Sequence, residues 1–171
     1  MVMTPRIRKF VLILHIISTI GWIGAIACFL VLAIVGLNSQ DVQVVSASYL
    51  SMELTARLVI VPLSIISLVS GLIQSFGTKW GLFSHYWVLI KFSLTVFAAI
   101  VLYLQLEPIS YIAGIDAETI LSSSNLRGGR MSLVVHAVGG IVVLLVVTTL
   151  SVYKPRGMTR YGWRKQNKYK E

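Results

Sequence analysis

Four long apolar runs constrain the fold of this 171-residue chain more than any other feature. The runs are Phe10–Leu37, Leu58–Thr78, Tyr86–Leu106 and Met131–Tyr153. Each reaches the roughly 20 residues that an α-helix needs to cross about 30 Å of hydrocarbon. The runs are continuous rather than alternating, and an open sheet would leave backbone groups unpaired in lipid, so strands are excluded. The sequence therefore predicts an all-α protein, an integral membrane four-helix bundle that forms a single membrane domain over residues 1–171.

The boundaries of the helices follow from the runs and from the polar segments between them. We expect helices at about 10–37, 57–77, 85–106 and 131–153. The segments Asn38–Leu54 and Glu107–Arg130 are predicted loops, since each lies between two spans. The second loop is long enough to hold a short helix around Ala117–Leu121, and Ser122–Gly129 is predicted to be flexible. Residues 154–171 form a predicted basic tail.

The net charge of +9 is distributed unevenly along the chain. Basic residues precede the first helix, follow the second and fill the tail; they are Arg6, Arg8, Lys9, Lys79, Lys154, Arg156, Arg160, Arg164, Lys165, Lys168 and Lys170. The other two connections hold all but one of the carboxylates, namely Asp41, Glu53, Glu107, Asp116 and Glu118. This asymmetry predicts a multi-pass protein of the cell inner (cytoplasmic) membrane with both termini in the cytoplasm. It argues against a nucleic-acid partner.

The basic tail has two interpretations. It suits anionic lipid headgroups, because each Lys or Arg near such a surface contributes about 1 kcal/mol. Alternatively, it only determines topology. Small residues along the first, second and fourth helices allow close backbone approach, so a homodimer is a further expected partner.

Three ionisable side chains lie inside the apolar runs, namely His15, Lys91 and His136. A polar group at this depth is costly in hydrocarbon, so each is a functional-site candidate. For His15, the alternative is a packing histidine that bonds to a neighbouring helix. For Lys91, the alternative is snorkelling of its long stem toward the membrane surface.

Depth along each helix groups most of the polar side chains into one layer. At about 1.5 Å per residue, His15 and Lys91 lie about 8–10 Å from the cytoplasmic ends of their helices. The predicted inner layer contains His15, Gln74, His85 and Lys91. Trp22 continues the face of His15 two turns further along, at i+7. No carboxylate lies in this layer to neutralise Lys91, which favours an anionic ligand over a bare metal cation.

His136 falls outside the inner layer. It lies about seventeen residues from the cytoplasmic end of the fourth helix, or roughly 25 Å. Its neighbours in depth are Glu53 and Arg57, which can pair at i,i+4. Two histidines that share one haem must both reach the same iron. Since depth separates His15 from His136 by roughly 15 Å, His15 alone remains the best candidate for an axial ligand.

Two short motifs resemble known families of small bacterial membrane proteins. The segment Leu14-His15-Ile16-Ile17…Trp22-Ile23-Gly24-Ala25 resembles the first helix of the HemJ-type protoporphyrinogen oxidases and of the CopD-type copper-resistance proteins. The segment His85–Phe92, with Trp87 and Lys91, is similar to the Trp…Lys-Leu start of a later helix in both. The segment Gly71–Phe92 looks closer still to an uncharacterised family of bacterial four-helix membrane proteins.

The resemblance carries its own implications. In the HemJ type, the first-helix histidine and this lysine are functional and haem b is bound. Carried over, it implies a haem-binding protein in which His15 ligates the iron and Lys91 pairs with a propionate or gates access. His85, Trp22 and Gln74, from the inner layer and the face of His15, complete the expected haem b site. Electron transfer or haem-linked oxidation would follow. The first helix lacks the aromatic-Pro-Arg segment of the HemJ type, which weakens the case for oxidase chemistry. The alternative is a non-enzymatic membrane module for transport, copper handling or partner binding.

Overall fold

The computed structural model describes residues 3–77, 81–155 and 157–167, with side chains as far as residue 164. Within these ranges every regular element is helical. The elements are α1 (Pro5–Asn38), α2 (Val42–Thr55), η1 (Ala56–Ile60), α3 (Val61–Gly77), α4 (Tyr86–Ala113), α5 (Ala117–Ser122), α6 (Ser124–Tyr153) and α7 (Arg160–Asn167). Four units are long and apolar enough to cross a membrane, namely α1, the continuous Val42–Gly77, α4 and α6. The predicted all-α bundle of four apolar helices is confirmed.

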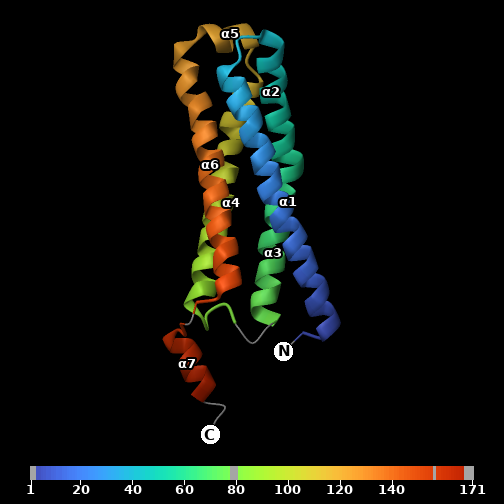
Figure 1. Cartoon of the computed structure of the whole chain (residues 1–171), viewed down its shortest axis with the longest axis vertical. Helices are drawn as coiled ribbons and strands as arrows, with labels where there is room; N and C mark the ends of the chain where they lie inside the picture. The colour runs from blue at the N-terminus through green and yellow to red at the C-terminus, as the bar shows by residue number, and fades with distance from the viewer. Residues whose placement is uncertain (1–2, 78–80, 156, 168–171) are drawn as a thin grey trace.

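The four long units pack around a common core (Figure 1). Helix α1 contacts α2 and α3 on one side and α6 on the other, and α4 contacts α6, α2 and α3. The start of α1, the end of α6 and α7 lie at one end of the bundle, here called the tail end. Helix α5 lies across the opposite end, here called the α5 end. The start of α1 and α7 therefore lie at the same end of the bundle.

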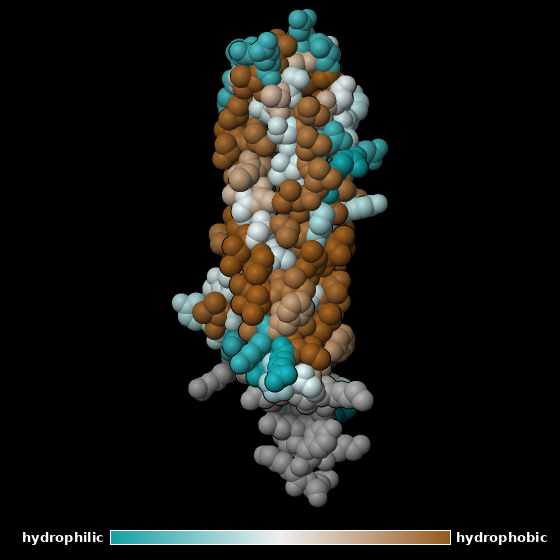
Figure 2. Space-filling model, turned by 90° about the vertical axis from the view of Figure 1, so that its right-hand side faces the viewer, coloured by the Kyte–Doolittle hydropathy of each residue, from teal (hydrophilic) through white to brown (hydrophobic). Residues whose placement is uncertain are grey.

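The outer surface of the bundle is apolar along its length. Figure 2 shows hydrophobic side chains along the shaft and hydrophilic ones gathered mainly near its ends. Phe10, Leu58 and Val152 are 67%, 71% and 72% exposed. Monomeric soluble proteins rarely expose contiguous apolar patches of this extent, whereas lipid chains cover such a surface favourably. The protein is therefore a multi-pass membrane protein with four candidate spans.

The prediction of a loop over Asn38–Leu54 is wrong, because most of this segment forms α2. The carboxylate of Asp41 caps the helix by accepting hydrogen bonds from the Gln43 and Val44 amides at 2.8 and 3.2 Å. Such a cap satisfies amides that have no partner within the helix. Tyr49 and Met52 are almost fully buried in the core, which anchors α2 to the bundle.

The second predicted loop is also shorter than expected. Helix α4 continues through Pro108 to Ala113, and α6 begins at Ser124, so the predicted flexibility of Ser122–Gly129 is wrong. The short helix near Ala117–Leu121 is confirmed as α5. The length of an apolar run predicts only the part of a helix that faces lipid. A helix can continue beyond that run where it packs against other helices.

A π-helical turn joins α2 to α3 without a break. In η1 the Val61 amide donates to the Ala56 carbonyl, five residues back. Pro62 follows directly; it has no N–H, and its ring crowds the carbonyl four residues earlier. A π turn opens the helix by one residue at this point, which accommodates the proline.

A buried arginine holds the α5 end together. Arg130 of α6 is 6% exposed. Its guanidinium donates to the Gly36 and Leu37 carbonyls of α1 at 2.6 and 3.1 Å. It also donates to the Tyr49 hydroxyl of α2 at 2.9 Å and to the Ile120 carbonyl of α5 at 3.3 Å. One side chain thus joins four helices and satisfies carbonyls at the end of α1.

The described part of the basic tail docks on the segment before α4. The Thr159 hydroxyl donates to the Phe83 carbonyl at 2.5 Å, and the Thr159 amide donates to the Ser84 carbonyl at 3.1 Å. Gly162 is buried against Ser84, where a Cβ atom would overlap the Ser84 backbone. The start of α7 is therefore an ordered part of the tail end.

Candidate functional site

His15 lies on the face of α1 that packs against α3. Its Nδ1 is 3.0 Å from the Ser67 carbonyl oxygen and 3.1 Å from the Ser70 hydroxyl oxygen. Gly71 leaves room for the imidazole, since a Cβ there would lie 3.2 Å from His15 Cε1. The ring is therefore held in one orientation between α1 and α3.

The hydrogen bond from Nδ1 fixes which ring nitrogen of His15 is available. A carbonyl oxygen only accepts, so Nδ1 carries the hydrogen that it donates to Ser67. The Ser70 hydroxyl donates to the Ile66 carbonyl at 2.6 Å and so can accept from the same N–H. The lone pair of the neutral ring then lies on Nε2, which has no hydrogen-bond partner among the described residues. This is the arrangement in which histidine ligates metals.

Neutral polar groups surround His15 along the interface of α1 and α3. Buried serines of α3 form a stripe, here called the serine seam, which contains Ser64, Ser67 and Ser70. The Thr19 hydroxyl donates to the His15 carbonyl at 2.8 Å and lies 2.9 Å from the Ser67 hydroxyl. The seam fixes the imidazole without placing any charge beside it.

Lys91 brings a positive charge to the same region from α4. Its ammonium lies within electrostatic range of the His15 imidazole and of Lys154 at the end of α6. Its ammonium forms no ion pair with a carboxylate of the described residues. The ion pair that the structure does contain among the described residues lies elsewhere, nearer the α5 end. It joins Arg57 to Glu53 at 3.1 Å. That pairing confirms the i,i+4 expectation for Glu53 and Arg57.

The other predicted site residues lie at different levels. The Gln74 amide donates to the Val11 carbonyl at 3.2 Å, about one turn nearer the tail end than His15. His85 precedes α4 as its N-cap residue and forms an antiparallel bridge with Met158 of the tail. Lys91 therefore lies within electrostatic range of His15, Gln74 lies at the α1–α3 interface about one turn nearer the tail end, and His85 is attached to the docked tail.

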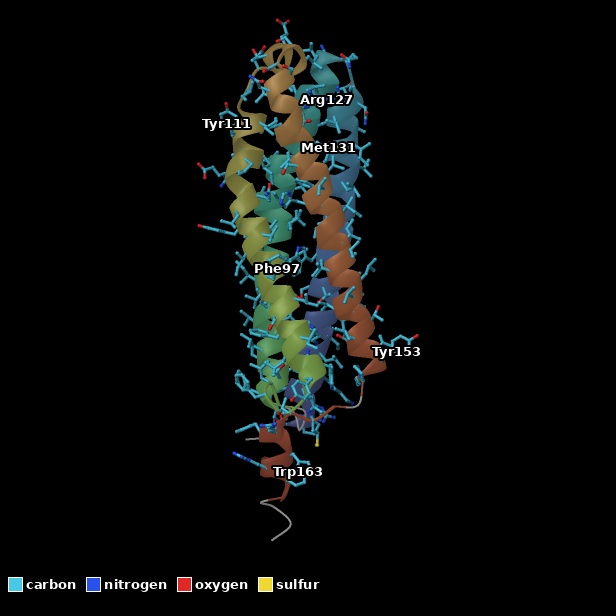
Figure 3. All side chains as sticks on the ribbon, turned by 90° about the vertical axis from the view of Figure 1, so that its left-hand side faces the viewer. Phe97, Tyr111, Arg127, Met131, Tyr153 and Trp163 are labelled. Carbon is cyan, nitrogen blue, oxygen red and sulfur yellow. The ribbon has the colours of Figure 1, made fainter. Side chains whose placement is uncertain are left out.

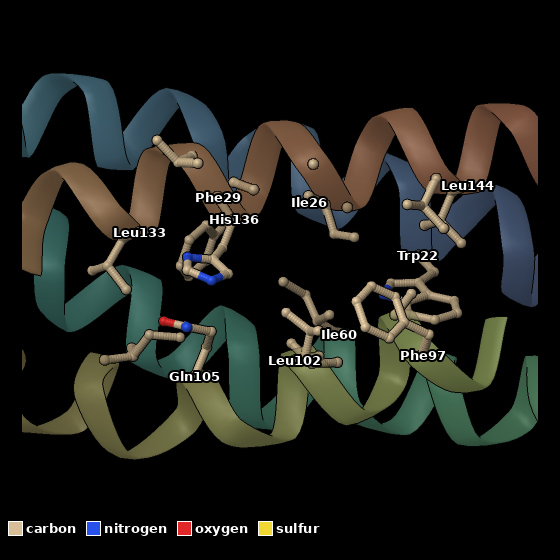
Figure 4. A pocket seen from close by; sticks show the side chains of 18 residues that line it. Trp22, Ile26, Phe29, Ile60, Phe97, Leu102, Gln105, Leu133, His136 and Leu144 are labelled. Atoms are coloured by element: carbon tan, nitrogen blue, oxygen red, sulfur yellow. The ribbon is translucent and has the colours of Figure 1, made fainter. Parts of the chain in front are cut away.

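Trp22 belongs to a different part of the bundle. It is 1% exposed and lines a cavity of about 340 Å³ together with His136. Figure 4 shows His136 at the level of Phe29 along the bundle. Phe29 lies fourteen residues beyond His15 on α1, which corresponds to about 21 Å. The two histidines lie in separate layers, in agreement with the depth count.

The side chains around His15 limit what the region can hold. Within the described ranges, no group of three His, Cys, Asp or Glu side chains could hold a metal ion. A bare cation would need such a group, whereas a metalloporphyrin supplies four nitrogen ligands and needs only one or two from the protein. Among the described residues, an Nε2 without a hydrogen-bond partner and an ammonium without a carboxylate partner are chemically compatible with an anionic metalloporphyrin rather than a bare cation.

Comparison with protein-family models, with curated proteins and with solved structures finds no match to this chain.

The sequence prediction missed two polar residues that the structure singles out. The sequence places Arg130 in a predicted loop, yet it is buried and joins four helices. Gln105 lies within the third apolar run and lines the cavity beside His136. The depth of Gln105 along its helix could have predicted this position, because Gln105 lies toward the α5 end of α4 just as His136 does in α6.

Proposed function

We propose that the protein binds haem b in the half of the bundle nearer the tail end. His15 Nε2 is the axial ligand in this proposal, and Lys91 pairs with a propionate. The observation that carries the proposal is the Nδ1–H bond from His15 to the Ser67 carbonyl at 3.0 Å, which leaves Nε2 as the lone-pair nitrogen. A bound haem supplies one-electron redox chemistry, so the proposed activity is electron transfer or haem-linked oxidation.

The residues around His15 support this assignment chemically. The carbonyl bond at Nδ1 orients the ring and raises the basicity of Nε2, as outer partners of metal-bound histidines do. An unpaired ammonium in an apolar span is costly, and an anionic propionate would offset that cost. Neither feature requires a second protein histidine in the same layer.

The placement in the cell is part of the proposal. The charge asymmetry supports both termini in the cytoplasm and a location in the cytoplasmic membrane. The basic tail then lies at the inner surface, where anionic headgroups are its proposed partners. Reporter fusions after Lys154 and within residues 107–130 test this topology. A cytoplasmic signal from the second fusion would contradict it.

Absorbance spectroscopy of the purified protein tests the haem proposal. Wild type, expressed with an ample haem supply, should show a Soret band that shifts on reduction. His15→Ala should lose the band, because Nε2 is removed. The matched control is His136→Ala, which removes a histidine from the other layer and should keep it. A colourless wild type that cannot take up haem would contradict the proposal and favour a non-enzymatic membrane module.

Substitutions of Lys91 test its role separately. If Lys91 pairs with a propionate, Lys91→Arg should keep much of the haem affinity, because the charge remains. Lys91→Gln and Lys91→Met should weaken it about tenfold, which corresponds to about 1.4 kcal/mol for a lost charged contact. Equal affinity across all three variants would remove Lys91 from the site while leaving His15 as the ligand.

A further inference from the structure

A second candidate site is a cavity of about 340 Å³ between α1, α4 and α6, lined by Trp22 toward the tail end and by His136 toward the α5 end. The cavity is separate from the region around His15 and does not depend on haem. Its volume is within the range of about 300–1,000 Å³ that small-molecule sites occupy. Most of its wall is apolar, and Trp22, Phe29 and Phe97 contribute aromatic rings (Figure 4).

Two polar side chains in this apolar wall, Trp22 and Gln105, have no side-chain hydrogen-bond partner among the described residues. Trp22 Nε1 is the one fully buried side-chain nitrogen or oxygen without a hydrogen bond among the described residues. In Figure 4 its nitrogen lies on the side of the ring that faces the middle of the cavity. The Gln105 amide forms no hydrogen bond to any described residue, and it points toward His136 across the cavity. Hydrocarbon cannot satisfy such groups, so a ligand that does would be favoured.

The imidazole of His136 completes the pattern with an acceptor. Its Nδ1 donates to the Ser132 carbonyl at 2.7 Å, so the lone pair of the neutral ring lies on Nε2. The cavity thus offers an N–H donor at the Trp22 end. At the other end it offers an amide that both donates and accepts and an imidazole acceptor. Trp22 and Phe29 mark these ends on α1 and are seven residues apart, or about 10 Å.

The cavity reaches the side of the bundle. Phe97 of α4 and Val135 of α6 line it and are 58% and 60% exposed. Figure 3 shows Phe97 on α4 where that helix faces α6. This lateral surface is apolar and lies within the candidate spans, so a molecule dissolved in the bilayer can reach the cavity without crossing water.

We propose that this cavity binds a lipid-soluble, quinone-type ring, with one ring oxygen accepting from Trp22 Nε1 and the opposite oxygen bonded to Gln105 and His136. A flat ring suits the aromatic wall, since stacked and edge-on aromatic contacts are favourable. Oxygens at both ends of the ring match polar groups at both ends of the cavity. A phospholipid acyl chain has no oxygen at membrane mid-depth and would leave Trp22 Nε1 and the Gln105 amide unsatisfied.

Binding of 1,4-naphthoquinone and of naphthalene to the full-length protein in quinone-free nanodiscs tests the proposal. The two probes share a flat, fused two-ring carbon skeleton, and only naphthoquinone carries hydrogen-bond acceptors, its two opposite carbonyl oxygens. We expect naphthoquinone to bind at least tenfold more tightly. Trp22→Phe and Gln105→Leu should each weaken naphthoquinone about tenfold and leave naphthalene unchanged, because each removes one hydrogen bond. Gly140→Leu should abolish binding of both probes, because Gly140 lines the cavity and a leucine side chain there would occupy it. A Cβ at 140 would meet Ile26 Cδ1 at an ordinary 3.7 Å, so the backbone tolerates the substitution.

Thr149→Val is the matched control, because Thr149 is an exposed polar residue of α6 outside the cavity. It should bind naphthoquinone as wild type does. Circular dichroism and thermal unfolding identify any variant that fails to fold, and the remaining variants then decide the result. Equal affinity for the two probes, or naphthoquinone binding that survives Gly140→Leu, would overturn the proposal. Co-purification of a phospholipid that fills the cavity and excludes naphthoquinone would also overturn it.

Discussion

The two ends of the bundle differ in whether their polar side chains have hydrogen-bond partners. At the α5 end, Arg130 is buried and its guanidinium forms hydrogen bonds with four partners on three other helices. Toward the tail end, Lys91 has no carboxylate partner among the described residues, and His15 keeps Nε2 unpaired. A polar group whose hydrogen bonds are complete contributes to stability, whereas an incomplete one is costly unless a ligand completes it. The comparison assigns stability to the α5 end and binding to the other.

Removing the guanidinium should produce the largest loss of stability. Arg130→Met keeps the aliphatic bulk but leaves the Gly36 and Leu37 carbonyls and the Tyr49 hydroxyl without their donor. We expect a loss of about 3 kcal/mol in the free energy of unfolding. Thermal unfolding in detergent measures it. Arg127→Met, an exposed arginine one turn earlier on α6, is the control and should change stability by less than about 0.5 kcal/mol. Similar losses in both variants would contradict the assigned role.

A single methyl group should also disturb the α5 end. A Cβ at Gly36 would lie 3.0 Å from Tyr49 Cζ and 3.3 Å from Ser48 Cβ, so the ring that contacts Arg130 must move. We expect Gly36→Ala to lower stability by about 1–2 kcal/mol. Gly24 lies on the same helix and nothing comes within 4 Å of a Cβ built there. Gly24→Ala should therefore be neutral or slightly stabilising in the same unfolding assay. If both alanines behave alike, the close contact is not the cause.

The opposite sign is expected at Lys91. Lys91→Met replaces an ammonium that has no carboxylate partner by an apolar side chain of similar length. In haem-free protein this should raise the free energy of unfolding by about 1 kcal/mol. The same variant should lose haem affinity, so stability and binding change in opposite directions. A clear decrease in stability would show that Lys91 has a structural role. The polar groups at both ends of the bundle would then contribute to stability, and the comparison would fail.

The smallest effect on global stability is expected in the docked tail. A Cβ at Gly162 would overlap the Ser84 backbone, whereas one at Gly157 would meet Tyr86 Cδ2 at an ordinary 3.7 Å. Gly162→Ala should release the tail and speed tryptic cleavage at Arg160 and Arg164, with little change in unfolding temperature. Gly157→Ala should be cleaved at the wild-type rate. Equal protection in both variants would mean that the contact at Ser84 does not hold the tail.

The sequence predicts those features that depend on the chemistry of single segments. The four spans, the short helix α5 and the Glu53–Arg57 pair follow from apolar length and from i,i+4 spacing. The depth count also places His15 and His136 in separate layers. In each case the physical cause lies within one helix or in the thickness of the membrane.

Features that depend on contacts between distant segments were missed. Helix α2 has only a moderately apolar sequence, and what buries Tyr49 and Met52 is the neighbouring bundle. The sequence predicts a loop at Arg130, because charge alone does not reveal that Gly36, more than ninety residues away, supplies its acceptor. The orphaned N–H of Trp22 is equally invisible in sequence, since an indole looks like any other apolar packing residue until its neighbours are known.

The π turn at Ala56–Ile60 sets the rotational phase of α3 relative to α2. Each residue of an α-helix advances the side chains by about 100°, so one additional residue in the turn rotates everything that follows by that angle. Without it, the face of α3 that carries Ser67 and Ser70 would turn away from α1. The orientation of His15 on α1 therefore depends on one additional residue in the π turn, which lies in the middle of the neighbouring span Val42–Gly77.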